Sequence, residues 1–317
     1  MKSSPSFVVS LLLTCSLAAC GSGDIACRVD SECTGGGVCS IGRCVPLADA
    51  PDLSVRTDRD LGPRGDMAQP AAPDGFSQDA FVAGCNFNND GVIQRAEMPA
   101  MAGLGGFFDA NQSGSTVPVN LNKTGDTWDF SAVGAGDAKV FDGLTSPTGT
   151  WWASSFPDAS YAQLTDADND LLGVYKIDDS HLYLLGVVSR AQSMYTTTKL
   201  SYSPPIEVIR FPLSTTSAWT STSSVTGTAA GYPFYATETW KMKVDDSGKA
   251  KTPAATFPSL RLRVDYTQLA DSVYTTNQVV YLWLTECYGT VVRIKSATGV
   301  TSADFTSAVE YRRMAAP

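Results

Sequence analysis

The chain has 317 residues, a formal net charge of −9 at pH 7 and a sequence pI of about 4.6. Such an acidic surface repels nucleic acid and anionic lipid headgroups, which argues against a nucleic-acid-binding protein. The length allows a large core and, as a first expectation, two domains.

Residues 1–19 have the pattern of an export signal. Lys2 supplies a weakly basic start, and an apolar run follows at residues 7–13. The stretch Leu17-Ala18-Ala19-Cys20 then resembles the lipobox of bacterial lipoproteins. The resemblance implies that a signal peptidase cleaves before Cys20 and that a lipid is attached to the Cys20 sulfur. An ordinary secretory signal with a chance cysteine is the alternative.

The lipobox also implies a location. Two or three acyl chains at Cys20 would attach the protein stably to a membrane. By resemblance to bacterial lipoprotein sorting, Gly21 in place of an aspartate favours the outer membrane, with the body facing the periplasm or the cell surface. No later segment reaches the ~20 apolar residues that a membrane helix needs.

Residues 20–45 form a cysteine-rich module after the expected cleavage site. Its cysteines are Cys27, Cys33, Cys39 and Cys44. An even number of cysteines outside the cytoplasm indicates disulfides, whereas zinc sites favour closer pairs. Three connectivities are possible, and we favour Cys27–Cys39 with Cys33–Cys44. The module resembles those that follow the lipobox in myxobacterial-type surface lipoproteins, which implies a spacer.

Residues 46–75 are rich in proline and aspartate and show no apolar period. A segment of this composition cannot bury enough apolar surface to fold, so we expect a disordered linker. A flexible coil of this length would hold the body roughly 30 Å from the membrane on average.

Residues 86–97 contain the motif with the clearest chemistry. The segment resembles the calcium loop of EF-hand and dockerin-like proteins, because oxygen-bearing side chains alternate before Gly91 and a glutamate closes the loop. The resemblance implies Ca²⁺ bound by the side chains of Asn86, Asn88, Asp90, Gln94 and Glu97 and by the carbonyl of Val92. Asn86 departs from the family, which usually has aspartate there. The site should therefore be weak and structural.

The alternative for this segment is a polar turn held by hydrogen bonds from asparagine and aspartate side chains. Pro99 and several glycines follow the loop, so residues 76–117 should hold the loop and one short helix.

The sequence pattern of residues 118–317 predicts an antiparallel β domain. Apolar runs at 171–177 and 181–189 flank a short polar turn and predict a hairpin. Residues 239–244 and 249–252 flank Asp245-Asp246-Ser247-Gly248, which predicts a second turn. Strict alternation at 260–266 predicts a half-buried strand. The protein should be mainly β, an antiparallel β-sandwich or a strongly curved half-barrel.

The stretch from Trp240 to Ile294 is the basis of the curved alternative. It loosely resembles exported lipoproteins of the lipoprotein-carrier type, which implies a concave face that holds acyl chains. A sandwich with an ordinary packed core is the interpretation that we favour. Cys85 and Cys287 remain as a pair distant in sequence. A disulfide between them would link the loop region covalently to a strand near the C-terminal end of the chain.

No catalytic motif is present in the sequence, so we do not expect an enzyme. The sequence favours a lipoprotein that binds a ligand or scaffolds the cell envelope, with an envelope protein, a polysaccharide or a lipid as partner. A carrier of lipids or other hydrophobic ligands is one alternative. A hydrolase with two carboxylates about 5–10 Å apart is the other.

Overall fold

The computed structural model describes residues 37–40, 43–46, 85, 87–111, 115–165, 171–193, 196–270 and 273–316. The chain divides into two compact units, Met1–Gln69 and Pro70–Pro317. In the first unit, β1 (Gly37–Ser40) pairs antiparallel with β2 (Arg43–Pro46), and Cys39 lies opposite Cys44 in the register.

The predicted lipid site at Cys20, the residues Cys27 and Cys33, and the linker after residue 46 lie outside the described residues. The disulfide connectivity of the cysteine-rich module therefore stays a prediction.

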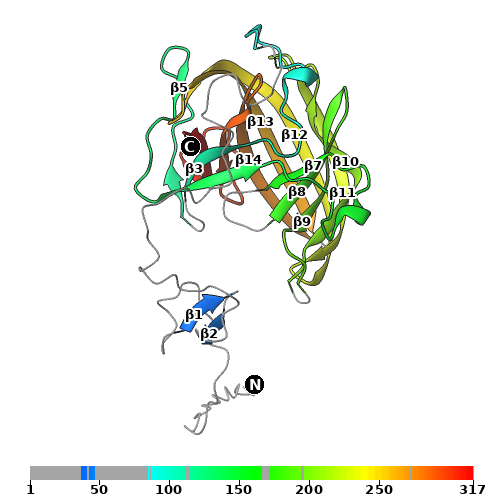
Figure 1. Cartoon of the computed structure of the whole chain (residues 1–317). Helices are drawn as coiled ribbons and strands as arrows, with labels where there is room; N and C mark the ends of the chain where they lie inside the picture. The colour runs from blue at the N-terminus through cyan, green and yellow to red at the C-terminus, as the bar shows by residue number, and fades with distance from the viewer. Residues whose placement is uncertain are drawn as a thin grey trace, which may run out of the picture. The chain divides into compact units, whose positions relative to one another are not determined.

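The second unit is built on one large, strongly curved sheet (Figure 1). Its strand order is β6-β3-β16-β15-β14-β13-β12-β11-β10-β9-β8-β7, with β4 beside β16 and β5 parallel to β12. The strands are β3 (Gly105–Asn111), β4 (Val117–Pro118), β5 (Thr127–Asp129), β6 (Asp137–Gly143), β7 (Tyr161–Leu164), β8 (Leu171–Ile177), β9 (His181–Ser189), β10 (Lys199–Arg210), β11 (Ala218–Ala229), β12 (Tyr232–Lys251), β13 (Thr256–Ala270), β14 (Tyr274–Thr285), β15 (Gly289–Ser296) and β16 (Ser307–Ala315).

The two ends of this strand order meet. Thr145, just after β6, forms an isolated bridge with Ala162 of β7. The Thr145 N–H donates to the Ala162 carbonyl at 2.7 Å, and the Ala162 N–H donates to the Thr145 carbonyl at 2.9 Å. The sheet is therefore barrel-like and nearly closed. The expectation of a mainly β, antiparallel protein is confirmed, and of the two predicted architectures the structure has the curved one.

The strands β8 and β9 coincide with the two apolar runs, and they pair antiparallel as a hairpin. The turn predicted at residues 245–248 is wrong, because β12 continues through it with a bulge between Val244 and Asp246. A Cβ at Gly248 would lie 2.4 Å from the Asp126 carbonyl oxygen. Gly248 therefore permits a close approach of the chain beside β5, and not a reversal.

The two faces of β14 are both buried. Val280, Leu282 and Leu284 face the inside of the barrel-like sheet. Trp283, on the opposite face, packs against Trp128 and Phe130 at ring-centroid distances of 5.6 and 4.7 Å. The segment around β5 thus covers the outside of the sheet and builds a second core there.

Residues 87–97 pack against one end of the barrel-like sheet. Ile93 pairs with Leu213 through two backbone hydrogen bonds of 2.9 Å. Its side chain is buried in a cluster with residues from the matching ends of β9, β10, β13 and β14. The predicted short helix is a single 3-10 turn, η3 (Arg95–Glu97). A second one is η4 (Ala153–Ser155).

Candidate functional site

A cavity of about 380 Å³ lies inside the barrel-like sheet. Protein interiors are normally packed so closely that few voids exceed the size of a water molecule. This cavity instead falls in the range of about 300–1,000 Å³ that is typical of small-molecule sites. Its apolar wall consists of Leu144, Leu164, Leu182, Leu184, Val208, Ile209, Val264, Val280, Leu282 and Leu284.

Strand register places aromatic side chains on the same wall. Trp240 of β12 lies opposite Tyr266 of β13, which lies opposite Gln278 of β14. Trp240 and Tyr266 make an edge contact with ring centroids 5.8 Å apart. Because residues directly opposite one another on neighbouring strands point to the same face of the sheet, these three residues all line the cavity.

The floor of the cavity comes from the segment after the predicted calcium loop. Met98 and Pro99 line it, and Met98 is buried together with Ile93 in the cluster at that end of the sheet. The loop and the cavity are therefore parts of one packed arrangement.

A group of buried charges lies on the wall formed by β6, β15 and β16. Arg312 contacts Asp142 at 2.6 Å and Glu310 at 3.0 Å, and Arg293 approaches Glu310 at 3.4 Å. Gln163 donates to the same Asp142 oxygen at 3.0 Å. Burial raises the pKa of Asp142, while Arg312 opposes this effect. Buried ion pairs cost desolvation energy and stabilise a fold poorly, so such a group on a cavity wall suggests a binding role.

A second buried carboxylate, Glu238 on β12, has a different environment. It accepts hydrogen bonds from the Tyr266 hydroxyl at 3.0 Å, the Tyr202 hydroxyl at 3.3 Å, Gln268 at 3.0 Å and the Trp240 indole at 3.1 Å. Burial and the neighbouring Glu238 raise the pKa of both tyrosines. Four donors thus replace the water around this carboxylate.

Two further tyrosines, Tyr161 of β7 and Tyr175 of β8, stack in the cavity with ring centroids 5.4 Å apart. Burial raises the pKa of each hydroxyl. Tyr161 lies opposite Tyr175 in the register, and Gln163, the next residue on the same face of β7, donates to Asp142, so the tyrosine pair lies near the buried charges.

The predicted calcium loop is partly described, since Asn86 lies outside the described residues. Asn88 and Glu97 come together, because the Asn88 side-chain amide donates to one Glu97 oxygen at 3.3 Å. The other Glu97 oxygen accepts the Gln94 backbone N–H at 2.8 Å. Asp90 is exposed and accepts the Val92 N–H at 2.8 Å.

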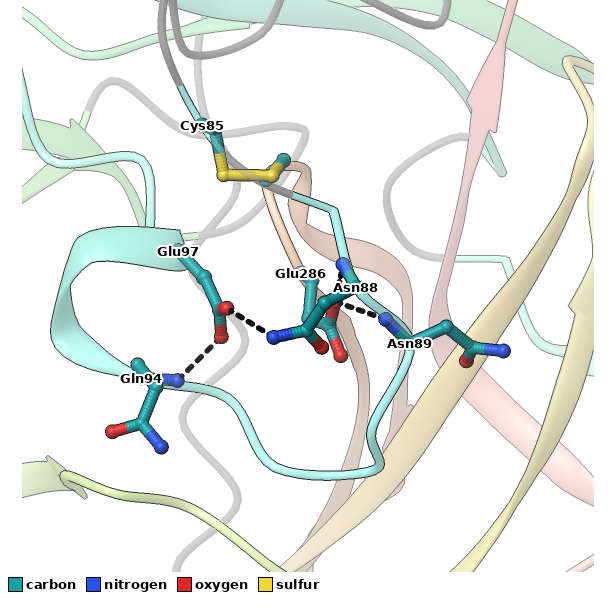
Figure 2. The surroundings of a disulfide bond; sticks show 7 residues. Cys85, Asn88, Asn89, Gln94, Glu97 and Glu286 are labelled. Carbon is teal, nitrogen blue, oxygen red and sulfur yellow. Dashed lines mark hydrogen bonds between the residues drawn. A yellow bond between two sulfur atoms is a disulfide. The ribbon is translucent and has the colours of Figure 1, made fainter.

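The structure adds a carboxylate that the sequence did not suggest. Glu286, which follows β14, accepts the backbone N–H groups of Asn88 and Asn89 at 3.0 and 2.8 Å (Figure 2). The disulfide Cys85–Cys287 brings this region to the loop, with the two Cα atoms 5.8 Å apart. The predicted pairing of these cysteines is thus confirmed.

The oxygen donors of Asn88, Asp90, Glu97 and Glu286 are chemically suited to Ca²⁺, which prefers oxygen ligands. Among the described residues, no three His, Cys, Asp or Glu side chains form a group that could hold a metal ion. The acids of the loop therefore do not converge by themselves, and backbone and amide oxygens would have to complete the set.

Sequence reasoning missed the cavity residues Tyr161, Asp142, Glu238 and Arg293. On β15, the apolar residues Val292 and Ile294 belong to the outer core, and Arg293 between them lines the cavity. Charged residues in phase on adjacent strands, as at Arg293 and Arg312, were the available signal.

Comparison of the chain with protein-family models, curated proteins and solved structures finds no match. Within the described part of the chain, no helix combines the length and the apolar character that crossing a bilayer requires.

Proposed function

We propose that this protein binds a small hydrophobic or amphipathic molecule inside its barrel-like domain and does not catalyse a reaction. The cavity of about 380 Å³ carries the proposal. A binding pocket is typically apolar and aromatic with a few polar groups that orient the ligand, and this cavity has that composition. The nearly closed β fold is compatible with a ligand carrier.

The position of the cavity supports binding over simple loose packing. Packing inside the cavity is not what stabilises the domain, because the outer face of β14 is packed against Trp128 and Phe130. The inner wall holds buried charges and tyrosine hydroxyls, which would not be retained merely to fill space.

We propose further that the protein is a bacterial outer-membrane lipoprotein, anchored through Cys20. The lipobox-like Leu17-Ala18-Ala19-Cys20 supports the anchor. The disulfide Cys85–Cys287 supports an oxidising compartment, since disulfides are rare in the cytoplasm. A binding domain attached in this way would keep its ligand at the membrane surface.

In this proposal, calcium bound by residues 86–97 would stabilise the loop and would take no part in ligand binding. The contacts of Glu97 with Asn88 and Gln94, together with Glu286, support a compact oxygen-rich loop. Because the next residues form the floor of the cavity, calcium would stabilise that floor.

A fluorescence titration tests ligand binding. The uncharged probe N-phenyl-1-naphthylamine should bind saturably to the purified soluble domain. Val280→Trp places a large side chain in the cavity and should weaken probe binding by about tenfold or more, because the overpacked site has no room for it. Val273→Trp, at an exposed position before the same strand, is the matched control and should bind like the wild type.

Circular dichroism and thermal unfolding establish that both variants are folded. Unchanged saturable binding by folded Val280→Trp would place the probe elsewhere and contradict the proposal.

A further inference from the structure

We propose that the ligand carries a carboxylate head group, bound by Arg293, Tyr161 and Tyr175 inside the cavity. The inference rests on the proposed function, because it assigns the polar end of the molecule that the apolar wall would hold. It is carried by donors that line the cavity and make no hydrogen bond with any residue that the structure describes.

Arg293 is the first of these donors. Its side chain is 24% exposed and lines the cavity. Its Nε lies 3.4 Å from a Glu310 oxygen, yet the guanidinium makes no hydrogen bond with any residue that the structure describes. Arg312 differs, because it contacts both Asp142 and Glu310 within 3.0 Å. Arg312 is thus the main cationic partner of the two carboxylates, although one Asp142 oxygen and both Glu310 oxygens accept no hydrogen bond from any described residue. The Arg293 Nε likewise donates to no described residue, so Arg293 keeps donors for a ligand.

The two stacked tyrosines supply the next donors. Neither the Tyr161 nor the Tyr175 hydroxyl has a hydrogen-bond partner in the described part of the chain. A buried tyrosine hydroxyl usually finds a partner, as Tyr202 and Tyr266 do on Glu238. An acceptor bound in the cavity would supply that partner.

The charge of the same wall favours an anion. Lys295 lies next to Arg293 in phase on β15 and lines the cavity, and no ion pair joins it to another described residue. With Arg293 and Arg312 the wall holds three cations against two carboxylates, Asp142 and Glu310. The remaining acid, Glu238, stands on β12 and already accepts four hydrogen bonds.

A carboxylate fits these groups better than a neutral head. Its oxygens accept several hydrogen bonds and pair with a guanidinium in a planar, two-bond geometry. The apolar side chains around Val264, Val280 and Leu282 would then contact the hydrocarbon part of the molecule. The predicted ligand class is a monocarboxylate with an apolar chain or ring body.

Calorimetric titration with decanoate, decanol and decylamine tests this assignment, because the three share a chain and differ in the head. Decanoate should bind on the order of tenfold more tightly than decanol, since charge-assisted hydrogen bonds are stronger than neutral ones. Decylamine should bind most weakly. The double variant Tyr161→Phe/Tyr175→Phe should lower decanoate affinity more than decanol affinity and so reduce the preference for decanoate, because only Arg293 then remains to donate to the head group.

Tyr274→Phe, which removes an exposed hydroxyl outside the cavity, is the matched control and should retain the preference for decanoate. The double variant removes only unpartnered hydroxyls, so thermal unfolding should show equal or higher stability. Arg293→Gln, which removes the charge at the site, should abolish the preference. If that variant fails to fold, the tyrosine pair still decides the question.

The outcomes separate the two proposals. Equal affinity for decanoate and decanol would overturn the carboxylate assignment and leave the binding function standing. A preference for decanoate that is undiminished in the tyrosine variant would overturn the assignment of the head group to this site. Failure of all three compounds to bind would overturn the binding function and the head group together.

Discussion

Asp129 shows how single polar contacts on the outer cover contribute to stability. Its carboxylate accepts hydrogen bonds from the Ser131 hydroxyl at 2.6 Å and the Ser131 N–H at 3.0 Å, and it pairs with Lys251 at 3.0 Å. These contacts favour the ionised form and lower its pKa from 3.8 to about 2.

The low pKa of Asp129 gives a signed pH prediction. Its folded-state pKa lies below the unfolded value, so its contribution to stability is complete above pH 3.8 and is lost as the pH falls towards about 2. Asp129→Asn should therefore flatten the dependence of the unfolding free energy on pH in this window. Denaturant unfolding at several pH values measures it, with Asp179→Asn in the exposed β8–β9 turn as the matched substitution. A slope identical to that of the wild type would contradict the assignment.

For individual residues of β15, the sequence could not reveal which side chains face the cavity. Alternation identifies two faces, and the apolar face is normally assigned to the interior. Here both faces are interior, because the segment around β5 covers the outside. The alternation therefore predicts that Arg293 faces solvent, although its side chain lines the cavity. Only the tertiary arrangement decides between the two faces.

Among the elements, the predicted calcium loop is the one whose chemistry can be tested directly. If Ca²⁺ binds with a dissociation constant of about 1 mM, 10 mM calcium stabilises the fold by about 1.4 kcal/mol and raises the melting temperature. Glu97→Gln and Glu286→Gln should each reduce this increase, because both remove a carboxylate at the loop. Calcium and chelator melts measure the effect.

Asp179→Asn, far along the chain in an exposed turn, serves as the charge-matched control for these variants. A melting temperature that calcium does not change, or an increase that survives both glutamine variants, would rule out the loop as a calcium site.

The elements themselves were predictable where one pattern dominated. β8 and β9 have the predicted bounds because their apolar runs end at a polar turn. β12 was divided wrongly, since Asp245 and Asp246 looked like turn residues. In the structure Asp245 pairs with Arg261 at 2.8 Å and Asp246 with Lys123 at 2.7 Å. Partners distant in sequence thus keep a polar stretch in a strand.

For the whole molecule, the anchor is the prediction with the widest consequence. Cys20→Ser removes the thiol that would accept the lipid, so the protein should no longer be labelled by a radioactive fatty acid in bacterial cells. It should also move from the detergent-rich to the aqueous phase on phase separation. Cys15→Ser, which alters a cysteine within the signal, is the control and should retain both properties. Labelling of Cys20→Ser would contradict the anchor.

The overall architecture was predictable only to the level of two alternatives. The number and spacing of strands suit a sandwich as well as a curved sheet. Closure depends on the bridge from Thr145 to Ala162, and the loop region is held by the disulfide from Cys85 to Cys287 at a sequence separation of 202. No local pattern encodes these contacts. The cysteine pair was inferred by counting, and the bridge left no sign in the sequence.

Because both faces of β14 are buried, the contacts that stabilise the fold and the side chains that shape the cavity lie on opposite faces of one strand. Trp283 and its neighbours on the outer face hold the sheet together, while Val280 and Leu282 on the inner face line the cavity. Substitutions on the inner face can therefore change the size and shape of the pocket at modest energetic cost. The same scaffold could in this way acquire new ligand preferences through a few changes in one strand, without loss of its fold.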